Sequence, residues 1–73
     1  MHIGRLIRQE IRIQGHTVKW FAEKLNCNRT NAYNIFRREN IDTEILIRIC
    51  IILNHNFFYD IFNVVETKLT NRK

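Results

Sequence analysis

Hydrogen-bonding side chains are concentrated in one short stretch of the chain, residues 29–37, with the sequence RTNAYNIFR. Arginine, threonine, asparagine and tyrosine carry donors and acceptors that match those of DNA base edges in the major groove. Asparagine is a poor helix former, so a helix that keeps Asn31 and Asn34 behind a cap at Asn28 gives up some stability. That cost favours a base-contacting surface over the alternative, an ordinary solvated helix face.

No other set of residues points to chemistry. The sequence shows no nucleophile–base arrangement, phosphate-binding loop or paired carboxylates, so we expect no enzyme. His2, His16 and His55 are scattered, and the two cysteines lack metal-ligand spacing, so we expect neither a metal nor another cofactor. Cys27 is predicted to be a small apolar anchor and Cys50 a core residue.

The excess positive charge lies in the first part of the chain. The net charge is +5, and residues 1–41 carry eight Lys or Arg against three Asp or Glu, whereas residues 42–73 carry four of each. A basic surface attracts polyanions such as nucleic acids. Charge alone leaves a merely solvated surface as an equal alternative.

The elements that position the polar stretch are predicted to be helices, since the chain has no proline and only two glycines to signal turns. Apolar residues recur at three- and four-residue steps, and Thr17, Asn28, Asp42 and Asn56 are expected caps. In the fourth segment the β-branched isoleucines make a strand the competing prediction, but its length favours a helix. We predict one domain, 1–73, with helices over residues 3–14, 18–25, 29–38, 43–54 and 57–67.

The segment VKWFAEKLNCNRTNAYNIF resembles the helix-turn-helix of the phage-repressor-like family (Cro/repressor, XRE). The resemblance lies in Ala22 at the close approach of two helices, Asn26 at the turn, and the apolar anchors Cys27, Ala32 and Ile35. It implies an all-α, compact five-helix bundle, the lambda-repressor-like DNA-binding domain. The family usually has Gln where this chain has Val18 and Gly where it has Asn26, so Thr17 or Lys19 is expected to take part of the glutamine's role.

The resemblance also implies which side chains face double-stranded DNA. The expected base contacts are Arg29, Thr30, Asn31, Tyr33 and Asn34, with Arg29 suited to guanine and an asparagine to adenine. The expected phosphate contacts are Thr17, Lys19, Asn28, Arg37 and Arg38. Trp20 is expected to pack between the first two helices rather than to reach phosphate.

The apolar excess of residues 43–67 requires either a shared core or a homodimer interface. For a dimer, the expected contributors are Ile47, Ile51, Phe58, Phe62 and Val65. The longest apolar stretch is too short to span a bilayer, so we expect a soluble, cytoplasmic protein of prokaryotic or phage type, associated with the nucleoid. The leading hypothesis is a sequence-specific transcriptional repressor acting by operator occlusion. The alternatives are a protein-interaction module, such as an antitoxin or accessory subunit using the aromatic C-terminal helix, and nonspecific coating of nucleic acid.

Overall fold

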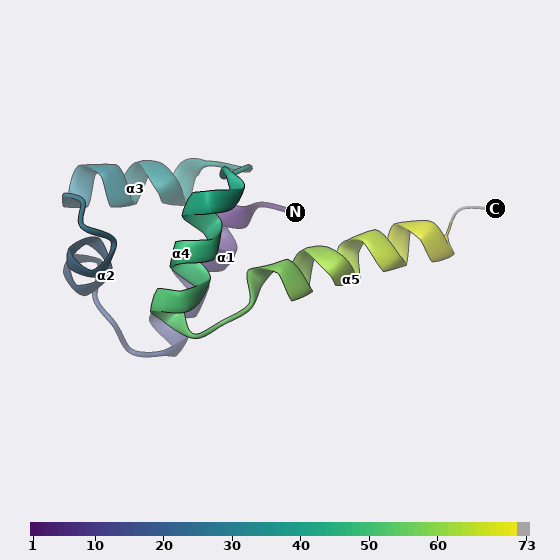
Figure 1. Cartoon of the computed structure of the whole chain (residues 1–73), viewed down its shortest axis with the longest axis horizontal. Coiled ribbons are helices and arrows are strands. Elements are labelled where there is room, and N and C mark those ends of the chain that lie inside the picture. The colour runs from purple at the N-terminus through teal and green to yellow at the C-terminus, as the bar shows by residue number, and fades with distance from the viewer. Residues whose placement is uncertain (72–73) are drawn as a thin grey trace.

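The computed structural model describes residues 1–71, and over that range the chain folds into five helices without a strand (Figure 1). They are α1 (Ile3–Ile13), α2 (Val18–Leu25), α3 (Arg29–Arg37), α4 (Thr43–Leu53) and α5 (Phe57–Thr70). The prediction of an all-α chain with five helices in this order is confirmed. The bounds agree within one residue except at the end of α5, which runs three residues further. Residues 72 and 73 of the predicted domain lie outside the described part.

A polar side chain caps the N-terminus of each helix. Thr17, Asn28 and Asp42 each accept a hydrogen bond from the backbone N–H three residues on, at 3.0, 2.8 and 3.0 Å. His2 and Asn56 cap α1 and α5 in a similar way. Each of these bonds satisfies one of the N–H groups that a helix leaves unpaired in its first turn. The four caps predicted from sequence are therefore present.

Residues in the left-handed backbone conformation end or follow three of the helices. Gly15, Asn26 and Asn54 have φ angles of 77°, 61° and 49°. Glycine adopts this conformation without a Cβ penalty, and asparagine tolerates it better than most residues. Asn26 therefore supplies the conformation for which glycine is the usual choice, and it turns the chain from α2 into α3.

The core is apolar throughout and draws on all five helices. Its buried side chains are Ile3, Ile7, Ile11, Phe21, Ala22, Leu25, Ala32, Phe36, Leu46, Ile49, Leu53 and Phe57. Within each helix these residues are separated mainly by three or four positions, the spacing that keeps side chains on one face. Ala22 of α2 and Ala32 of α3 are small residues that are both buried in this core.

The start of α1 is hydrogen-bonded to the end of α3. The backbone N–H groups of Ile3 and Gly4 donate to the carbonyls of Glu39 and Arg38, at 3.1 and 2.9 Å. Unpaired donors of one helix end thus meet the carbonyls that follow another helix, and the two ends satisfy each other. Gly4 is buried at this contact, and a Cβ there would stand 2.7 Å from the carbonyl oxygen of Arg38.

Helix α5 projects from the rest of the molecule (Figure 1). Only its first residue, Phe57, is buried. The principal extents are 45 × 20 × 19 Å, and the radius of gyration is 13.1 Å, against about 11 Å expected for a compact domain of this length. The globule is therefore made by α1–α4 and the first turn of α5, and the remainder of α5 stands in solvent.

A histidine clamp fixes the base of α5 to α1. The Nε2 atom of His55 lies 2.9 Å from a carboxylate oxygen of Asp60, and its Nδ1 atom lies 3.6 Å from one of Glu10. Gln14 reinforces the clamp by donating to Glu10 and to the backbone carbonyl of Leu53 at the end of α4. These polar contacts and the buried Phe57 together hold the base of α5 against the globule.

Replacing the clamp histidine is expected to loosen α5 while leaving the globule folded. His55→Ala removes the Asp60 contact, a hydrogen bond to a charged group, and should cost about 1–2 kcal/mol of unfolding free energy. Hydrogen exchange should accelerate in the first turns of α5 and not in α2 or α3. His16→Ala, which removes a histidine that contacts Trp20 of α2 and not α5, is the control and should leave exchange in α5 unchanged. Equal acceleration in α3 on His55→Ala would contradict a clamp that acts on α5 alone.

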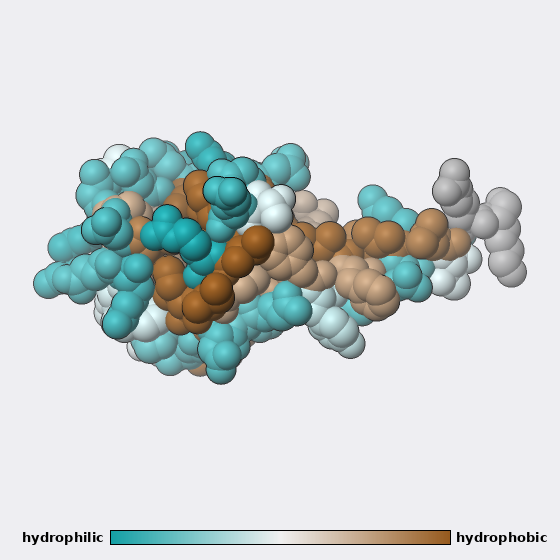
Figure 2. Space-filling view, viewed as in Figure 1, coloured by the Kyte–Doolittle hydropathy of each residue, from teal (hydrophilic) through white to brown (hydrophobic). Residues whose placement is uncertain are grey.

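Apolar side chains remain exposed on α4 and α5, and Figure 2 shows them as a surface running from α4 along one side of α5. On α4 they are Ile47 and Ile51, which is 75% exposed. On α5 apolar residues at three- and four-residue spacing form what we call the α5 stripe, of which Phe62, Val65 and Leu69 are exposed and Phe58 and Ile61 are half-buried. The stripe continues to Leu69, beyond the predicted end of the helix at residue 67.

No single helix among residues 1–71 is long and apolar enough to cross a bilayer. Helices α4 and α5 meet the criteria of length and composition only when taken together, and the chain bends by 118° between them.

Candidate nucleic-acid interface

Helix α3 presents most of its surface to solvent. Ala32 and Phe36 anchor it in the core, and Ile35 is half-buried. All ten residues predicted to contact DNA are exposed: Arg29, Thr30, Asn31, Tyr33, Asn34, Thr17, Lys19, Asn28, Arg37 and Arg38. Those on α3 point in three different directions around the helix axis, because successive helical residues are rotated by about 100°.

The outermost line of α3 is formed by Thr30, Asn34 and Arg37, which we call the α3 crest. These residues are three or four positions apart and lie opposite the buried face. The Nη1 atom of Arg37 donates to the amide oxygen of Asn34 at 3.5 Å. The crest therefore offers a hydroxyl, a carboxamide and a guanidinium in a row, with no acidic residue anywhere between Lys24 and Arg38 in the sequence.

The flank of α3 that faces α1 carries Tyr33. Its ring packs edge-on against Phe36, with 5.9 Å between centroids. The guanidinium carbon of Arg8 lies 5.4 Å from the Tyr33 ring centroid and 5.0 Å from that of Phe36. Such cation–π contacts hold an arginine in place without neutralising its charge. Arg29 lies on this side of α3 as well, one turn before Tyr33.

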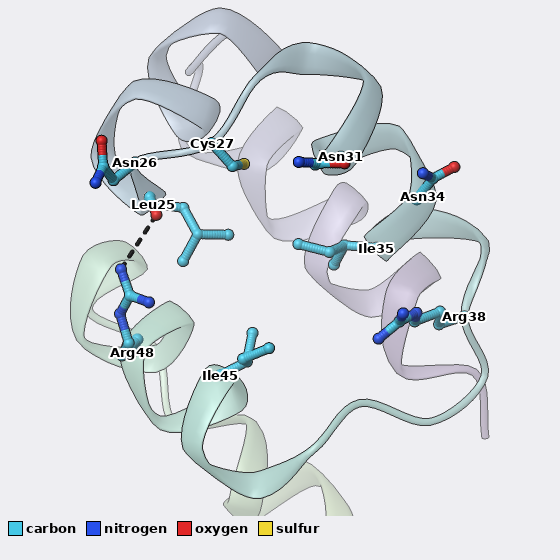
Figure 3. A pocket seen from close by; sticks show the side chains of 9 residues that line it. All are labelled: Leu25, Asn26, Cys27, Asn31, Asn34, Ile35, Arg38, Ile45 and Arg48. Carbon is cyan, nitrogen blue, oxygen red and sulfur yellow. Dashed lines mark hydrogen bonds between the residues drawn. The ribbon is translucent and has the colours of Figure 1, made fainter.

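The opposite flank of α3 borders a hollow of about 340 Å³ between α3, α4 and the turn after α2, which we call the α3–α4 hollow (Figure 3). Asn31 points into it, Arg38 stands at one side, and Arg48 of α4 stands at the other. The structure thus separates Asn31 from Arg29 and Tyr33, with which the sequence grouped it as a base contact, and Arg38 from Arg37, with which the sequence grouped it as a phosphate contact. Asn34 belongs both to the crest and to the rim of this hollow.

Two of the predicted phosphate contacts use their side-chain oxygens elsewhere. The hydroxyl of Thr17 and the amide oxygen of Asn28 cap α2 and α3. They remain exposed at helix N-termini, where backbone N–H groups and the helix dipole favour an anion. Lys19 in the first turn of α2 is exposed and adds a positive charge at the same end.

Helix α1 adds a basic surface that the sequence analysis did not assign. Arg5, Arg8 and Arg12, the α1 arginine row, line one hollow together with Phe36 of α3. Their spacing of three and four residues is visible in the sequence and places them on one helical face. What the sequence does not reveal is that this face lies beside α3, since that follows from the packing of α1 on α3.

The two departures from the family pattern have different structural outcomes. Asn26 adopts the left-handed conformation, as glycine does. Val18 is half-buried and packs against the core, so it contributes packing where a glutamine would offer a polar group. Trp20, expected to pack between the first two helices, is half-buried, and its ring stacks on His16 in the turn before α2, with centroids 3.5 Å apart.

Within residues 1–71 no group of three or more His, Cys, Asp or Glu side chains is placed to hold a metal ion. Cys27 packs against the core as a half-buried apolar residue, and the sulfur of Cys50 accepts a hydrogen bond from the backbone N–H of Phe57 at 3.4 Å. No protein-family model, curated protein or solved structure matches this chain.

Proposed function

We propose that α2 and α3 form a helix-turn-helix and that the protein is a sequence-specific DNA-binding regulator, a repressor that acts by occupying an operator. The observation that carries this proposal is the α3 crest. Thr30, Asn34 and Arg37 are exposed in a row on a helix whose two ends are fixed by hydrogen bonds. A single α-helix fits the DNA major groove, and these side chains suit its base edges.

The basic residues on both sides of α3 support the same docking. With the crest in the groove, the α1 arginine row and Tyr33 lie toward one wall of phosphates. Lys19 and the N-terminus of α2 supply further anion contacts. In this docking Arg29 contacts bases from the N-terminal end of α3, and Arg38 contacts a phosphate beyond the C-terminal end of the helix.

The proposed DNA-bound form is a homodimer joined through the α5 stripe, with Ile47 and Ile51 of α4 at its margin. Four of the five predicted contributors, Ile47, Ile51, Phe62 and Val65, are exposed, and Phe58 is half-buried. A stripe without charged residues on a projecting helix suits burial against a second copy. Such dimers contact two half-sites about 34 Å apart.

Selection of bound duplexes from a random library tests the proposal directly. The expected result is a palindromic consensus, because a symmetric dimer requires two matching half-sites. Binding without an enriched sequence and with a steep salt dependence would instead indicate nonspecific coating. Absence of DNA binding at low salt would overturn the proposal.

Removing one crest side chain should weaken specific binding only. Asn34→Ala is expected to reduce affinity for the selected site about tenfold, since a bidentate base contact contributes roughly 1–3 kcal/mol. Binding to random duplex should stay within a factor of two. Asn63→Ala, which removes the same side chain from α5, is the control. Equal losses on specific and random DNA would assign Asn34 to the phosphate backbone.

The projecting α5 also supports a second candidate function, a protein-interaction module such as an antitoxin. Its apolar stripe would then cover a partner protein and not a second copy. The selection experiment and the oligomeric state together separate the two. A monomer that selects no DNA sequence favours the interaction module, whereas a dimer with a palindromic site favours the regulator.

A further inference from the structure

We propose that the α3–α4 hollow is a binding site for a small organic anion, a carboxylate or phosphate carried on a compact apolar body. Its volume of about 340 Å³ lies at the lower end of the range for ligand pockets, roughly 300–1000 Å³. It combines polar groups at its sides with an apolar interior, the arrangement typical of such pockets.

The polar groups of the hollow are cationic or neutral. Arg38 and Arg48 stand on opposite sides of it, and Asn31 points inward between them (Figure 3). No aspartate or glutamate is among its lining residues. Guanidinium groups match carboxylate and phosphate oxygens and form short, charge-assisted hydrogen bonds with them. The hollow therefore selects for negative charge.

Arg48 is held in position before any ligand binds. One Nη atom donates to the backbone carbonyl of Leu25 at 3.1 Å, at the end of α2. This bond uses one of the five N–H donors of the guanidinium, so others remain for an anion. An arginine that this bond already restrains loses less side-chain entropy on binding than an unrestrained one, which favours affinity.

The apolar interior is formed by Leu25, Ile35 and Ile45 (Figure 3). A bare inorganic anion would leave these side chains uncovered, whereas an attached ring or branched chain would bury them. We therefore expect benzoate and phenyl phosphate to bind more tightly than acetate and inorganic phosphate. Benzamide, which has the shape of benzoate without its charge, should bind most weakly of the ring compounds.

The ligand would contact the interface helix itself, since Asn31, Asn34, Ile35 and Arg38 all belong to α3. Occupancy is thereby expected to alter DNA affinity, a consequence that rests on the proposed function. The binding site does not rest on it, because binding of the anion is measured without DNA. Failure of one proposal is thus distinguishable from failure of the other.

Titration of the ¹⁵N-labelled full chain with benzoate tests the site. We expect saturable shifts confined to the amides around residues 25–27, 31–38 and 45–48. Saturating benzoate should also slow alkylation of Cys27, which lines the hollow, but not of Cys50, which lies outside it. Shifts scattered over the surface, or equal binding of benzamide, would overturn the proposal.

Two variants and one control locate the charge recognition. Arg38→Ala and Arg48→Met should each weaken benzoate binding about tenfold, as expected for a charge-assisted hydrogen bond. Arg38 makes no side-chain hydrogen bond in the described part of the chain, so its replacement tests the site even if Arg48→Met perturbs the fold. Arg12→Ala removes the same charge outside the hollow and should leave the affinity for benzoate unchanged. An equal loss with Arg12→Ala would show a nonspecific effect of net charge and overturn the proposal.

Discussion

Gly4→Ala is expected to destabilise the protein by about 3 kcal/mol or more, although alanine is the better helix former. An added Cβ would stand 2.5 Å and 2.7 Å from the carbonyl oxygens of Ile35 and Arg38, and it would also meet that of Phe36. These are backbone atoms that end α3, so they cannot rotate away as a side chain would. Overpacking of a well-filled core typically costs about 1–3 kcal/mol, and contact with an immobile backbone places this change at the upper limit.

The sign of the effect makes this experiment decisive. Helix propensity alone predicts that Gly4→Ala stabilises by about 1 kcal/mol, whereas the packing of α1 on α3 predicts a fall in Tm of at least about 12 °C. Gly15→Ala is the matched control. No atom lies within 4 Å of its Cβ, and only its φ of 77° opposes the change, which costs about 1–2 kcal/mol. A Gly4→Ala protein as stable as the parent would show that α1 does not pack on α3 in this way.

Phe62→Glu is expected to convert the proposed dimer into a monomer and to abolish tight binding to a two-half-site operator. Fully burying an exposed phenylalanine contributes about 1.5–3 kcal/mol, but Phe62 is already about half-buried, and a symmetric dimer buries two copies. The lost burial alone amounts to roughly 1.5–3 kcal/mol, so the dimer dissociation constant should rise by at least one to two orders of magnitude. Phe62 is 55% exposed in the single chain, so the unfolding free energy of the monomer should change little.

Analytical ultracentrifugation and operator titration at fixed salt check this result. Affinity for a single half-site should be unchanged, because the α3 crest is far from the substitution in the fold. Asn63→Glu introduces the same charge beside the α5 stripe, on the polar side of the helix, and should leave the dimer intact. A Phe62→Glu protein that still dimerises would place the interface elsewhere, with Ile47 and Ile51 of α4 as the next residues to test.

The helices were predictable because their signals are local. Caps such as Asn28 and Asp42 bond to N–H groups three residues away, and Asn26 ends α2 through its own backbone conformation. The projection of α5 was not predictable, because the contacts at its base join residues far apart in the sequence: His55 meets Glu10, 45 positions away, and Phe57 enters the core shared with the other helices. A pattern of apolar residues predicts which face of a helix is apolar, but it does not predict which other helix packs against that face.

The candidate interface was predictable only in part for the same reason. Exposure of Thr30, Asn34 and Arg37 follows from helical spacing against the apolar positions Ala32 and Phe36. Helical spacing does not predict which flank of α3 faces α1 and which faces the α3–α4 hollow, because that depends on where α1 and α4 pack. Arg8 lies beside Tyr33, and Arg48 lies at the far side of the α3–α4 hollow. Both come from helices that the sequence analysis did not include in the DNA-contacting surface.

The hydrogen bonds at the two ends of α3 bear on the entropy of association. Asn28 holds the first turn, and the N–H groups of Ile3 and Gly4 hold the carbonyls beyond the last turn. The backbone freedom of this helix is therefore lost when the chain folds and not when it meets a ligand. A preorganised surface binds with a smaller ordering cost than a segment that folds on contact. Association through α3 should accordingly resemble rigid-body docking, with little change in far-ultraviolet circular dichroism.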